Sequence, residues 1–481
     1  MRTARWIHLL SCVLLGLLAA QIARAEEPRT ARTPNIIFVL CDNLGNGDVA
    51  CFNPKTSHRT PHLDRMAAEG MKLTSFYSCS GVCTPSRASF MTGCYPRRVN
   101  MHESDTGKAV LQPVAQKGLN PDETTIAETM KAAGYATAII GKWHLGDQPE
   151  FLPTRQGFDS YYGIPYSDDM TRDKKPAIWP ELPLMRDQRV VEAPADRDTL
   201  TRRYTEEAIK FIRAQKDKPF FLFIPQAMPG STSTPYASEP FQGKSANGRW
   251  GDSVEELDWS MGQILDELKQ SGLDKQTLVI WTSDNGAPRR NPPQGSNAPY
   301  SGWGYNTSEG AMRMPCIMWW PGCIPPGATC DALCTMMDFL PTFAGLAAAL
   351  KPKAAIDGHD MASIWFGDRG TASPYDETGF FYYHIRQLQA VRSGPWKLYL
   401  QLPDKQKTLA DATAPAAAAL YNVREDLAEA NEVSAAHPNV IARLNALADV
   451  ARRELGDGDR VGAGQRPAGL VEKPTPRRKD D

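Results

Sequence analysis

Four short apolar runs, rich in β-branched and aromatic residues, are the feature that most restricts the fold of this sequence. Runs of this kind are typical of strands that are buried on both faces of a sheet. Helical patterns separate the runs, and strands that alternate with helices predict an α/β sandwich with a mostly parallel central sheet. The predicted strands cover residues 35–40, 136–140, 220–224 and 278–281, and the predicted helices cover residues 61–70, 122–134, 202–214 and 252–271.

Polar residues follow the predicted strands directly. In sheets of this kind, ligands bind outside the carboxyl ends of the strands. A single Asp-Asn pair at a strand end is most often only a turn, but two such pairs and a Lys-Trp-His segment at one edge indicate a functional site. The residues concerned are Asp42 and Asn43 after the first strand, Lys142 and His144 after the second, and Asp284 and Asn285 after the fourth.

The segment Cys83-Thr84-Pro85-Ser86-Arg87 has the features of an anion site at a helix start. Pro85 has a φ angle suited to a first helical turn. An oxyanion at residue 83 would face the free N–H groups and the positive end of the helix dipole. Arg87 lies one turn further on and is permanently charged. The alternative interpretation is a buried cysteine in a Pro-Ser turn, and the pentapeptide alone does not separate the two.

The first 25 residues have the pattern of a secretory signal peptide. Arg2 and Arg5 precede an apolar core over residues 6–20, and Ala23-Arg24-Ala25 is an A-x-A cleavage site. The core is shorter than the roughly 20 residues of a spanning helix, and no later segment qualifies. We therefore expect an exported protein, periplasmic or extracellular, with no stable membrane span.

Charge and cysteine content restrict the partners and the crosslinks. The net charge of −1 argues against a surface that coats polyanions, so nucleic acid is not an expected partner and anionic substrates must bind to local cations. Ten cysteines in an exported chain suggest disulfides. One local bridge is expected within the cluster Cys316, Cys323, Cys330 and Cys334, whose pairing the sequence does not reveal.

The pattern changes after about residue 350. Short antiparallel strands are predicted over residues 380–383, 388–392, 396–401 and 420–422, followed by a helix over residues 439–455. These elements predict a small α+β domain over residues 366–456, after a large domain over residues 33–365. Residues 457–481 are rich in Gly, Pro and charge, and are predicted to be disordered.

Further motifs accompany the C-x-P-S-R pentapeptide in a fixed order. They are Thr60-Pro61-His62-Leu63-Asp64, Gly93-Cys94-Tyr95-Pro96, Gly141-Lys142-Trp143-His144-Leu145-Gly146, Thr282-Ser283-Asp284-Asn285-Gly286 and Glu309-Gly310-Ala311-Met312-Arg313-Met314-Pro315. With these motifs, residues 34–455 resemble the sulfatases, and within them the arylsulfatase A-like proteins. The resemblance implies an alkaline-phosphatase-like core that binds calcium and hydrolyses sulfate esters.

The resemblance also implies the roles of individual residues. Cys83 would be oxidised to formylglycine by a maturation enzyme, and the hydrate of this aldehyde would attack sulfur. Its second hydroxyl would then expel sulfate, which a serine could not do without a separate water. His144 matches the position that handles the proton of that hydroxyl. Lys142 and Arg87 match positions that stabilise residue 83 and the sulfuryl oxygens, and Ser167 matches a residue near the sulfate.

The expected metal site contains hard oxygen donors. Asp42, Asn43, Asp284 and Asn285, together with residue 83, suit calcium or magnesium rather than zinc. The ion would act as a Lewis acid on a sulfate oxygen.

Three positions depart from the family pattern. Asn43 stands where Asp is common, Gly230 stands where many relatives have a histidine for the leaving group, and Gly304 stands where a lysine usually reaches the sulfate. The acid for the leaving group would then come from elsewhere, and the candidates are Tyr305, Lys244 and His102. The chain could also act on activated or differently charged esters, or be a catalytically weak relative.

The sequence therefore favours a sulfuric ester hydrolase that acts on a sulfated small molecule or glycan, by analogy a sulfated carbohydrate. Two alternatives remain open. One is a phosphonate or phosphate monoester hydrolase that uses the same nucleophile, and the other is a noncatalytic protein that binds sulfate esters.

Overall fold

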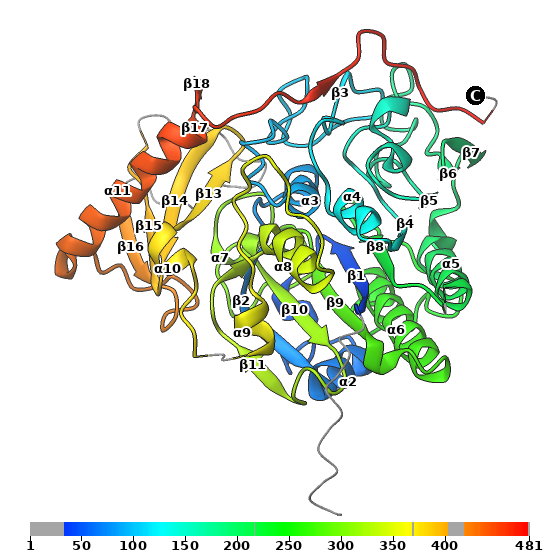
Figure 1. Ribbon diagram of the computed structural model, residues 1–481, viewed down its shortest axis with the longest axis horizontal. Coiled ribbons are helices and arrows are strands. Elements are labelled where there is room, and N and C mark those ends of the chain that lie inside the picture. The colour runs from blue at the N-terminus through cyan, green and yellow to red at the C-terminus, as the bar shows by residue number, and fades with distance from the viewer. Residues whose placement is uncertain (1–32, 216, 368–369, 403–417, 480–481) are drawn as a thin grey trace, which may run out of the picture. The chain divides into compact units, whose positions relative to one another are not determined.

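The four predicted strands lie next to one another in the centre of a large sheet (Figure 1). The computed structural model describes residues 33–215, 217–367, 370–402 and 418–479. The central strands are, in spatial order, β9 (Thr277–Ser283), β1 (Asn35–Asp42), β8 (Phe220–Pro229) and β4 (Ala136–Ile140), and all run parallel. The prediction of a mostly parallel α/β sheet is confirmed.

Further strands extend this sheet on both sides. They are β2 (Met71–Tyr77), β5 (Ser160–Gly163), β6 (Leu184–Arg186), β7 (Arg189–Glu192), β10 (Arg313–Trp319), β11 (Ala328–Cys330) and β12 (Cys334–Thr335). The sheet order is β11-β2-β10-β9-β1-β8-β4-β5-β6-β7, and β12 pairs with β2. We did not predict β10, which contains Pro315; a proline normally argues against a central strand. Pro315 is tolerated since the β10–β2 register shifts between Met314 and Cys316.

Helices cover both faces of the sheet because the central strands are apolar on both sides. Along β1, Ile36, Phe38 and Leu40 pack in one core and the residues between them in the other. One face is covered by α3 (Cys83–Thr92), α4 (Ile126–Ala132) and α8 (Phe339–Leu346), and the other by α2 (Pro61–Glu69), α5 (Leu200–Ala214) and α6 (Gly248–Gln270).

The helix predicted over residues 122–134 is shorter than expected. The Thr125 side chain accepts a hydrogen bond from the Glu128 amide at 3.1 Å, and the Glu128 carboxylate accepts one from the Thr125 amide at 2.8 Å. This capping box ends the helix at its amino side. Helix α4 therefore begins at Ile126.

A second, antiparallel sheet lies in the carboxyl-terminal part of the chain. It consists of β13 (Phe380–His384), β14 (Gln387–Ser393), β15 (Trp396–Tyr399) and β16 (Ala419–Asn422), preceded by the short helices α9 (Ala362–Phe366) and α10 (Tyr375–Thr378). Helix α11 (Pro438–Glu454) packs on β14 and β15. The predicted small α+β arrangement is thus confirmed. Residues 34–481 cluster as one compact unit, and the boundary between residues 365 and 366 stays a prediction.

The prediction that residues 457–481 are disordered is wrong for the part that the structure describes. After the short strands β17 (Gly456–Asp457) and β18 (Arg460–Val461), β19 (Gly469–Leu470) pairs with β3 (Lys117–Gly118) (Figure 1). Arg466 also forms an ion pair with Glu123 at 2.7 Å. Composition predicted disorder because the segment has few apolar residues, but hydrogen bonds to the large domain hold it in place.

Other predictions meet the limits of the described residues. The signal peptide over residues 1–25 lies outside them. Within the described chain, no helix is long and apolar enough to cross a bilayer. Within the described residues, Cys316 and Cys334 of the cluster in which we expected a local bridge carry free thiols.

Candidate active site

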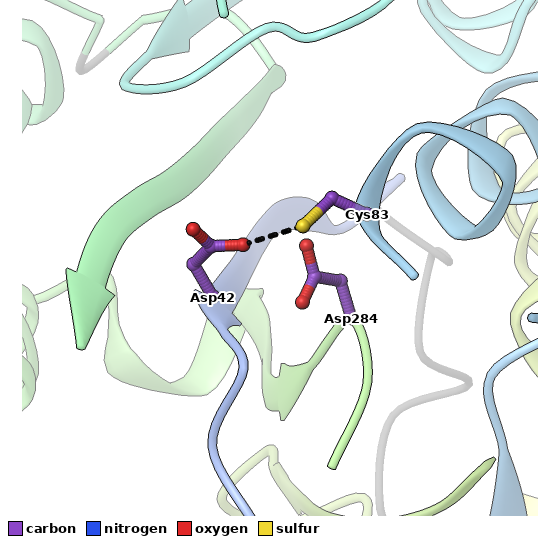
Figure 2. Close-up of side chains that lie close together, drawn as sticks. All are labelled: Asp42, Cys83 and Asp284. Atoms are coloured by element: carbon purple, nitrogen blue, oxygen red, sulfur yellow. Dashed lines mark hydrogen bonds between the residues drawn. The ribbon is translucent and has the colours of Figure 1, made fainter. Parts of the chain in front are cut away.

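The polar residues after β1 and β9 meet the start of α3 at one edge of the central sheet. Figure 2 shows Asp42, Cys83 and Asp284 with their side chains directed toward one another. The strand ends are held together by hydrogen bonds from the Asp284 amide to the Cys41 carbonyl at 3.0 Å and from the Asn43 amide to Asp284 Oδ1 at 3.0 Å. The sheet thereby joins residues that are far apart in the sequence.

Cys83 is the first residue of α3 and is almost fully buried. Its Sγ lies 3.0 Å from Asp42 Oδ1 and 3.7 Å from Asn43 Oδ1. Burial and the negative charges of Asp284 and Asp42 raise the pKa of the thiol well above its ordinary value. Because the thiolate is the reactive form of a cysteine, an unmodified Cys83 is a poor nucleophile here.

Two buried cations compensate the two carboxylates. Arg87 donates to Asp284 Oδ2 from Nε at 3.0 Å and from Nη2 at 2.9 Å, and Lys142 Nζ donates to Asp42 Oδ2 at 2.7 Å. Burial alone would raise the pKa of Asp42, but the charges of Lys142 and Arg87 outweigh it and lower the pKa. For Asp284, burial and the charge of Asp42 raise the pKa. The four side chains, Asp42, Arg87, Lys142 and Asp284, form what we call the active-site cluster, whose formal charges cancel.

His144 is buried beside the same helix start. Its main-chain carbonyl accepts a hydrogen bond from Thr84 Oγ1 at 3.0 Å, and its Nε2 lies 3.0 Å from the Leu111 carbonyl. A carbonyl can only accept, so Nε2 carries the proton and Nδ1 has a free lone pair. No group in the described chain bonds to this buried Nδ1. Burial and the charges of Lys142 and Arg87 lower the pKa of His144 well below its ordinary value, which keeps the ring neutral.

Ser167 and Asp168 lie on the other side of Lys142. Ser167 Oγ accepts a hydrogen bond from Lys142 Nζ at 3.2 Å. Asp168 is fully buried, and within the described residues neither carboxylate oxygen has a hydrogen-bond partner. Burial and the charges of Asp169 and Asp42 raise the pKa of Asp168 to about 8. A buried, unpaired carboxyl of this kind is costly, and sequence reasoning had not identified it.

The donors at this edge fit a hard divalent cation. One donor atom each from Asp42, Cys83 and Asp284 lies within 4.8 Å of the other two. Asn43 Oδ1 accepts from Asn285 Nδ2 at 2.6 Å, and the buried Asn285 Oδ1 has no partner among the described residues. Carboxylate and amide oxygens are the ligands that calcium and magnesium prefer, and the unpaired buried oxygen of Asn285 fits such a ligand set.

The backbone is strained at the same place. Asn43 and His144 both have a φ of 63°, and Tyr305 has a φ of 76°. Positive φ values are uncommon outside glycine and cluster at functional sites. Because of these positive φ angles, the side chains of Asn43 and His144 lie where a regular continuation of β1 or β4 would not place them.

Comparisons with known proteins identify one family. A family model described as Sulfatase matches residues 34–349. The chain is 39% identical to N-acetylgalactosamine-6-sulfatase of Mus musculus, covering 83% of this chain and 76% of that protein. It is 34% identical to arylsulfatase A of Homo sapiens, covering 90% and 89%.

This chain belongs to the sulfatase family. A solved structure of the PsFucS1 sulfatase from Pseudoalteromonas sp. has a TM-score of 0.75 and 26% identity, covering 90% of this chain and 93% of that one. The resemblance inferred from the motifs and the predicted alkaline-phosphatase-like fold are confirmed. The chain is a sulfatase enzyme.

The surroundings of Gly230 and Gly304 in this sulfatase leave little room for the histidine and the lysine that the family pattern has at these positions. Gly230 has a φ of 77°, and a Cβ there would lie 2.8 Å from Asp168 Oδ1. A Cβ at Gly304 would lie 2.3 Å from the Gly286 carbonyl oxygen, which is a backbone atom. A histidine at 230 or a lysine at 304 therefore requires the backbone to move.

Of the three proposed acids for the leaving group, the structure brings only Tyr305 to this site. Burial and the charge of Cys83 raise the pKa of its hydroxyl. Lys244 is exposed, and its main-chain amide donates a hydrogen bond to Asp252 Oδ1 at 3.0 Å. His102 contacts Arg97, and burial with the charges of Arg97 and Lys117 lowers its pKa to about 2, so its ring is neutral at pH 7 and is a poor acid.

Two further residues were missed because nothing in the local sequence marks them. Ser231 Oγ accepts from Asn43 Nδ2 at 3.0 Å and from the Tyr305 hydroxyl at 3.3 Å. Arg290 donates to the Ser231 carbonyl and, at 3.3 Å, to the Thr232 carbonyl. They connect the turn after β8 to the loop after β9, and Arg290 supplies a cation near Tyr305.

Proposed function

We propose that this sulfatase hydrolyses sulfate monoesters at residue 83 after a maturation enzyme has oxidised Cys83 to formylglycine. The observation that carries the proposal is the environment of the thiol, which lies at a helix start between Asp42 and Asp284 and stays protonated. Such a position suits an oxygen nucleophile better than a thiolate. The atom in the place of Sγ would then be a hydroxyl oxygen of the aldehyde hydrate.

The modified residue supplies one hydroxyl that attacks sulfur and displaces the alcohol of the ester, and a second whose deprotonation expels sulfate and restores the aldehyde. Lys142 and Arg87 hold their charges within the active-site cluster, where preorganised cations stabilise developing negative charge. Both cations are already oriented by carboxylates, so no reorganisation is needed when the ester binds.

His144 is the proposed base for the second hydroxyl. Its neutral ring and the free lone pair on Nδ1 are what proton acceptance requires. The contact between Nε2 and the Leu111 carbonyl fixes the tautomer. Ser167, hydrogen-bonded to Lys142, is proposed to contact the sulfate.

A calcium ion, or alternatively magnesium, is proposed between Asp42, Asn43, residue 83, Asp284 and Asn285. When bound, the ion supplies positive charge to a sulfate oxygen. The charges of the active-site cluster cancel without it, so a divalent cation would make the site positive and suited to an anionic ester. Asn43 in place of a second carboxylate keeps more of that positive charge.

The proposed substrate class is a sulfated carbohydrate. The support is the name of the relative N-acetylgalactosamine-6-sulfatase, which acts on a sulfated amino sugar. Export to the periplasm or beyond, expected from residues 1–25, remains part of the proposal.

Mass spectrometry of the peptide that contains Cys83, from protein isolated through its export route, tests the nucleophile. We expect the aldehyde mass, and an unmodified thiol from a host that matures other sulfatases would contradict the proposal.

Rates on an aryl sulfate and the matching aryl phosphate test the reaction. Faster phosphate hydrolysis would identify a phosphate or phosphonate monoester hydrolase. Binding without turnover after full conversion would identify a binding protein.

A further inference from the structure

The active site has a base and two cations, but Tyr305 is a poor acid for the leaving group. When a sulfate ester is cleaved, the electron pair of the S–O bond stays on the alcohol oxygen, which a proton donor stabilises. The Tyr305 hydroxyl already donates to Ser231 Oγ at 3.3 Å. Burial and the charge of Cys83 raise the pKa of this hydroxyl, so it holds its proton tightly.

The carboxyl group of Asp168 lies between the turn after β8 and the residues that surround Lys142. Gly230 has no side chain, and Asp168 Oδ1 is 2.8 Å from the point where a Cβ would lie. The Gly230 amide donates to the Asp42 carbonyl at 3.0 Å. On the other side, Ser167 Oγ accepts from Lys142 Nζ at 3.2 Å. Asp168 therefore adjoins the groups that are expected to hold the sulfate.

Three residues beside the active-site cluster have buried polar atoms without a partner in the described chain, and their chemistry differs. His144 Nδ1 carries a lone pair, which accepts a proton but supplies none. Asn285 Oδ1 is an amide oxygen, which only accepts as well. The third group is the carboxyl of Asp168, and a protonated carboxyl donates. Of the three, Asp168 is thus the one that can supply a proton.

The surroundings of Asp168 favour its protonated form. Burial is the largest cause that raises its pKa to about 8, followed by the charges of Asp169 and Asp42, and the charges of Lys142 and Arg197 act in the opposite direction. A general acid works best when its pKa lies near the working pH. The groups that interact electrostatically with this carboxyl are Asp42, Lys142, Asp169, Arg197, Tyr204 and Tyr236.

Two other buried side chains near the site have unpaired atoms but are poorer acids. Tyr166 precedes Ser167, and its hydroxyl has no partner among the described residues. Burial and the charge of Asp147 raise the pKa of this hydroxyl well above its ordinary value. The Nε atom of Arg290 is also unpaired there, but a guanidinium does not release its proton in proteins.

A cavity beside Asp168 offers room for the alcohol part of the ester. Its volume is about 340 Å³, and Arg197 and Tyr236 are among the residues that line it. Arg197 Nη1 donates to the Asp168 carbonyl at 3.4 Å, and the guanidinium stacks on the Tyr236 ring at 4.3 Å. Pockets for small ligands typically have volumes of roughly 300–1,000 Å³. The departing alcohol therefore has a place next to Asp168.

We propose that Asp168 is the acid that protonates the alcohol of the sulfate ester cleaved at residue 83. The inference rests on the proposed function and adds a catalytic residue to it. While an oxygen of residue 83 forms a bond to sulfur, the S–O bond to the alcohol breaks, and the alcohol oxygen takes the proton of Asp168. The attacking hydroxyl releases one proton to solvent, and solvent reprotonates Asp168, so the step consumes no net proton.

The test compares the hydrolysis of phenyl sulfate with that of 4-nitrophenyl sulfate by the matured enzyme in calcium. Phenolate is the poorer leaving group, because phenol, like the tyrosine side chain, has a pKa of about 10, whereas the nitro group spreads the charge of 4-nitrophenolate. Asp168→Asn keeps the shape of the side chain without the acid, and Asp168→Ala removes both oxygens. Asp266→Asn, at a surface ion pair with Arg65, is the matched control. A thermal melt confirms that each variant is folded.

We expect Asp168→Asn to lower kcat/KM for phenyl sulfate by about 100-fold or more and to keep that for 4-nitrophenyl sulfate within about 3-fold, because only the poorer leaving group needs the acid. Asp168→Ala should show the same pattern, and the control should hydrolyse both esters as the wild type does. Tyr305→Phe should change both rates by the same factor. An equal loss on both esters in Asp168→Asn, or no loss on phenyl sulfate, overturns the inference.

Infrared spectroscopy gives a readout that does not depend on turnover. At pH 6, below the pKa of about 8, the wild type should show the carbonyl band of a neutral carboxyl that Asp168→Asn lacks. Other buried carboxyls with a raised pKa, such as Asp48 and Asp338, cancel in the difference spectrum. Absence of this band overturns the inference. Failure of the wild type to hydrolyse either ester instead overturns the proposed function, and the difference spectrum still reports on Asp168.

Discussion

Two buried clusters of opposite charges in this sulfatase look alike in composition but differ in how completely their hydrogen bonds are made. One is the active-site cluster. The other, which we call the inter-sheet cluster, joins the central sheet to the second sheet and consists of Glu309, Arg313, Arg392, Lys397 and Glu429. Both are enclosed by the fold, so burial alone does not distinguish function from architecture.

The inter-sheet cluster is well satisfied. Lys397 Nζ donates to the Thr307 carbonyl, to Glu309 and to Glu429, each at 3.0 Å, which uses all three of its protons. Glu309 also accepts from the hydroxyls of Tyr77 and Tyr382. A network of this kind specifies how two parts of a fold pack. It leaves little unused hydrogen-bonding capacity for a ligand.

The active-site cluster is surrounded by unused capacity. Within the described chain, His144 Nδ1, Asn285 Oδ1 and both oxygens of Asp168 are buried without partners. Positive φ values at Asn43 and His144 add strain. Native proteins rarely leave buried polar atoms unpaired. Such atoms occur elsewhere in the described chain too, but these four lie beside one charged cluster, whereas no side chain of the inter-sheet cluster has one, which indicates a place made for a ligand. The comparison teaches that unsatisfied atoms, rather than buried charges, mark the functional site.

The largest expected effect is on activity. Replacing Cys83 by Ala should lower turnover of an aryl sulfate by about 10⁴-fold or more, because the nucleophile is lost. The melting temperature should change by only a few degrees, since the side chain is small. Steady-state kinetics and a thermal melt check this. Retained turnover would contradict the proposed nucleophile. A large drop in melting temperature would contradict the conclusion that the site around Cys83 serves function rather than stability.

The next effect is on stability. Lys397→Met should lower the free energy of unfolding by about 3–5 kcal/mol, because Glu309 and Glu429 lose their buried partner. Urea denaturation measures this change, and turnover of the protein that stays folded should be close to wild type. A loss of less than about 1 kcal/mol would show that this cluster does not hold the two sheets together.

Calcium binding is the third test, because it should depend on the active-site cluster and not on the inter-sheet cluster. Calcium at about 100 times its dissociation constant should raise the free energy of unfolding by about 2.7 kcal/mol. Chelation with EGTA should reverse the rise and abolish hydrolysis. The Lys397→Met variant should show the same calcium-dependent rise, because the ion binds at the other cluster. Equal melting curves with calcium and with EGTA would argue against the proposed metal site.

The smallest effect concerns Asp168. Its pKa in the fold is raised to about 8, above the unfolded value, so ionisation costs stability and the wild type should become less stable as the pH rises from about 4 to 8. The groups that act on it are Asp169, Asp42, Lys142 and Arg197. Asp168→Asn should remove this pH dependence and raise the free energy of unfolding at pH 7 by roughly 1–3 kcal/mol.

The matched control for Asp168 is Asp266→Asn, because Asp266 is paired with Arg65 at 2.9 Å near the surface and is not among the groups that act on Asp168. Exposed pairs contribute little, so its effect should be below about 1 kcal/mol. Denaturant unfolding at pH 4, 6 and 8 distinguishes the two variants. An unchanged pH dependence in Asp168→Asn would show that this carboxyl finds a partner in solution.

Much of the fold could be predicted because its signals are local. The four central strands are almost entirely apolar, and three of them are followed directly by polar residues, so strand ends and site residues were visible together. The strand β10 was missed since Pro315 is tolerated only at a register shift that involves β2. The carboxyl-terminal segment was misjudged because its order comes from long-range hydrogen bonds, such as that between Thr475 and Gln148.

The sequence by itself determined which side chains stand at the strand ends and at the start of α3, because short motifs specify local backbone and chemistry. Only the tertiary structure decided their partners: that Arg87 binds Asp284, that Lys142 binds Asp42, and that Asp168 lies near them. The physical reason is that pairing, burial and unpaired atoms depend on distances between segments, which the packing of strands and loops sets and no local pattern contains.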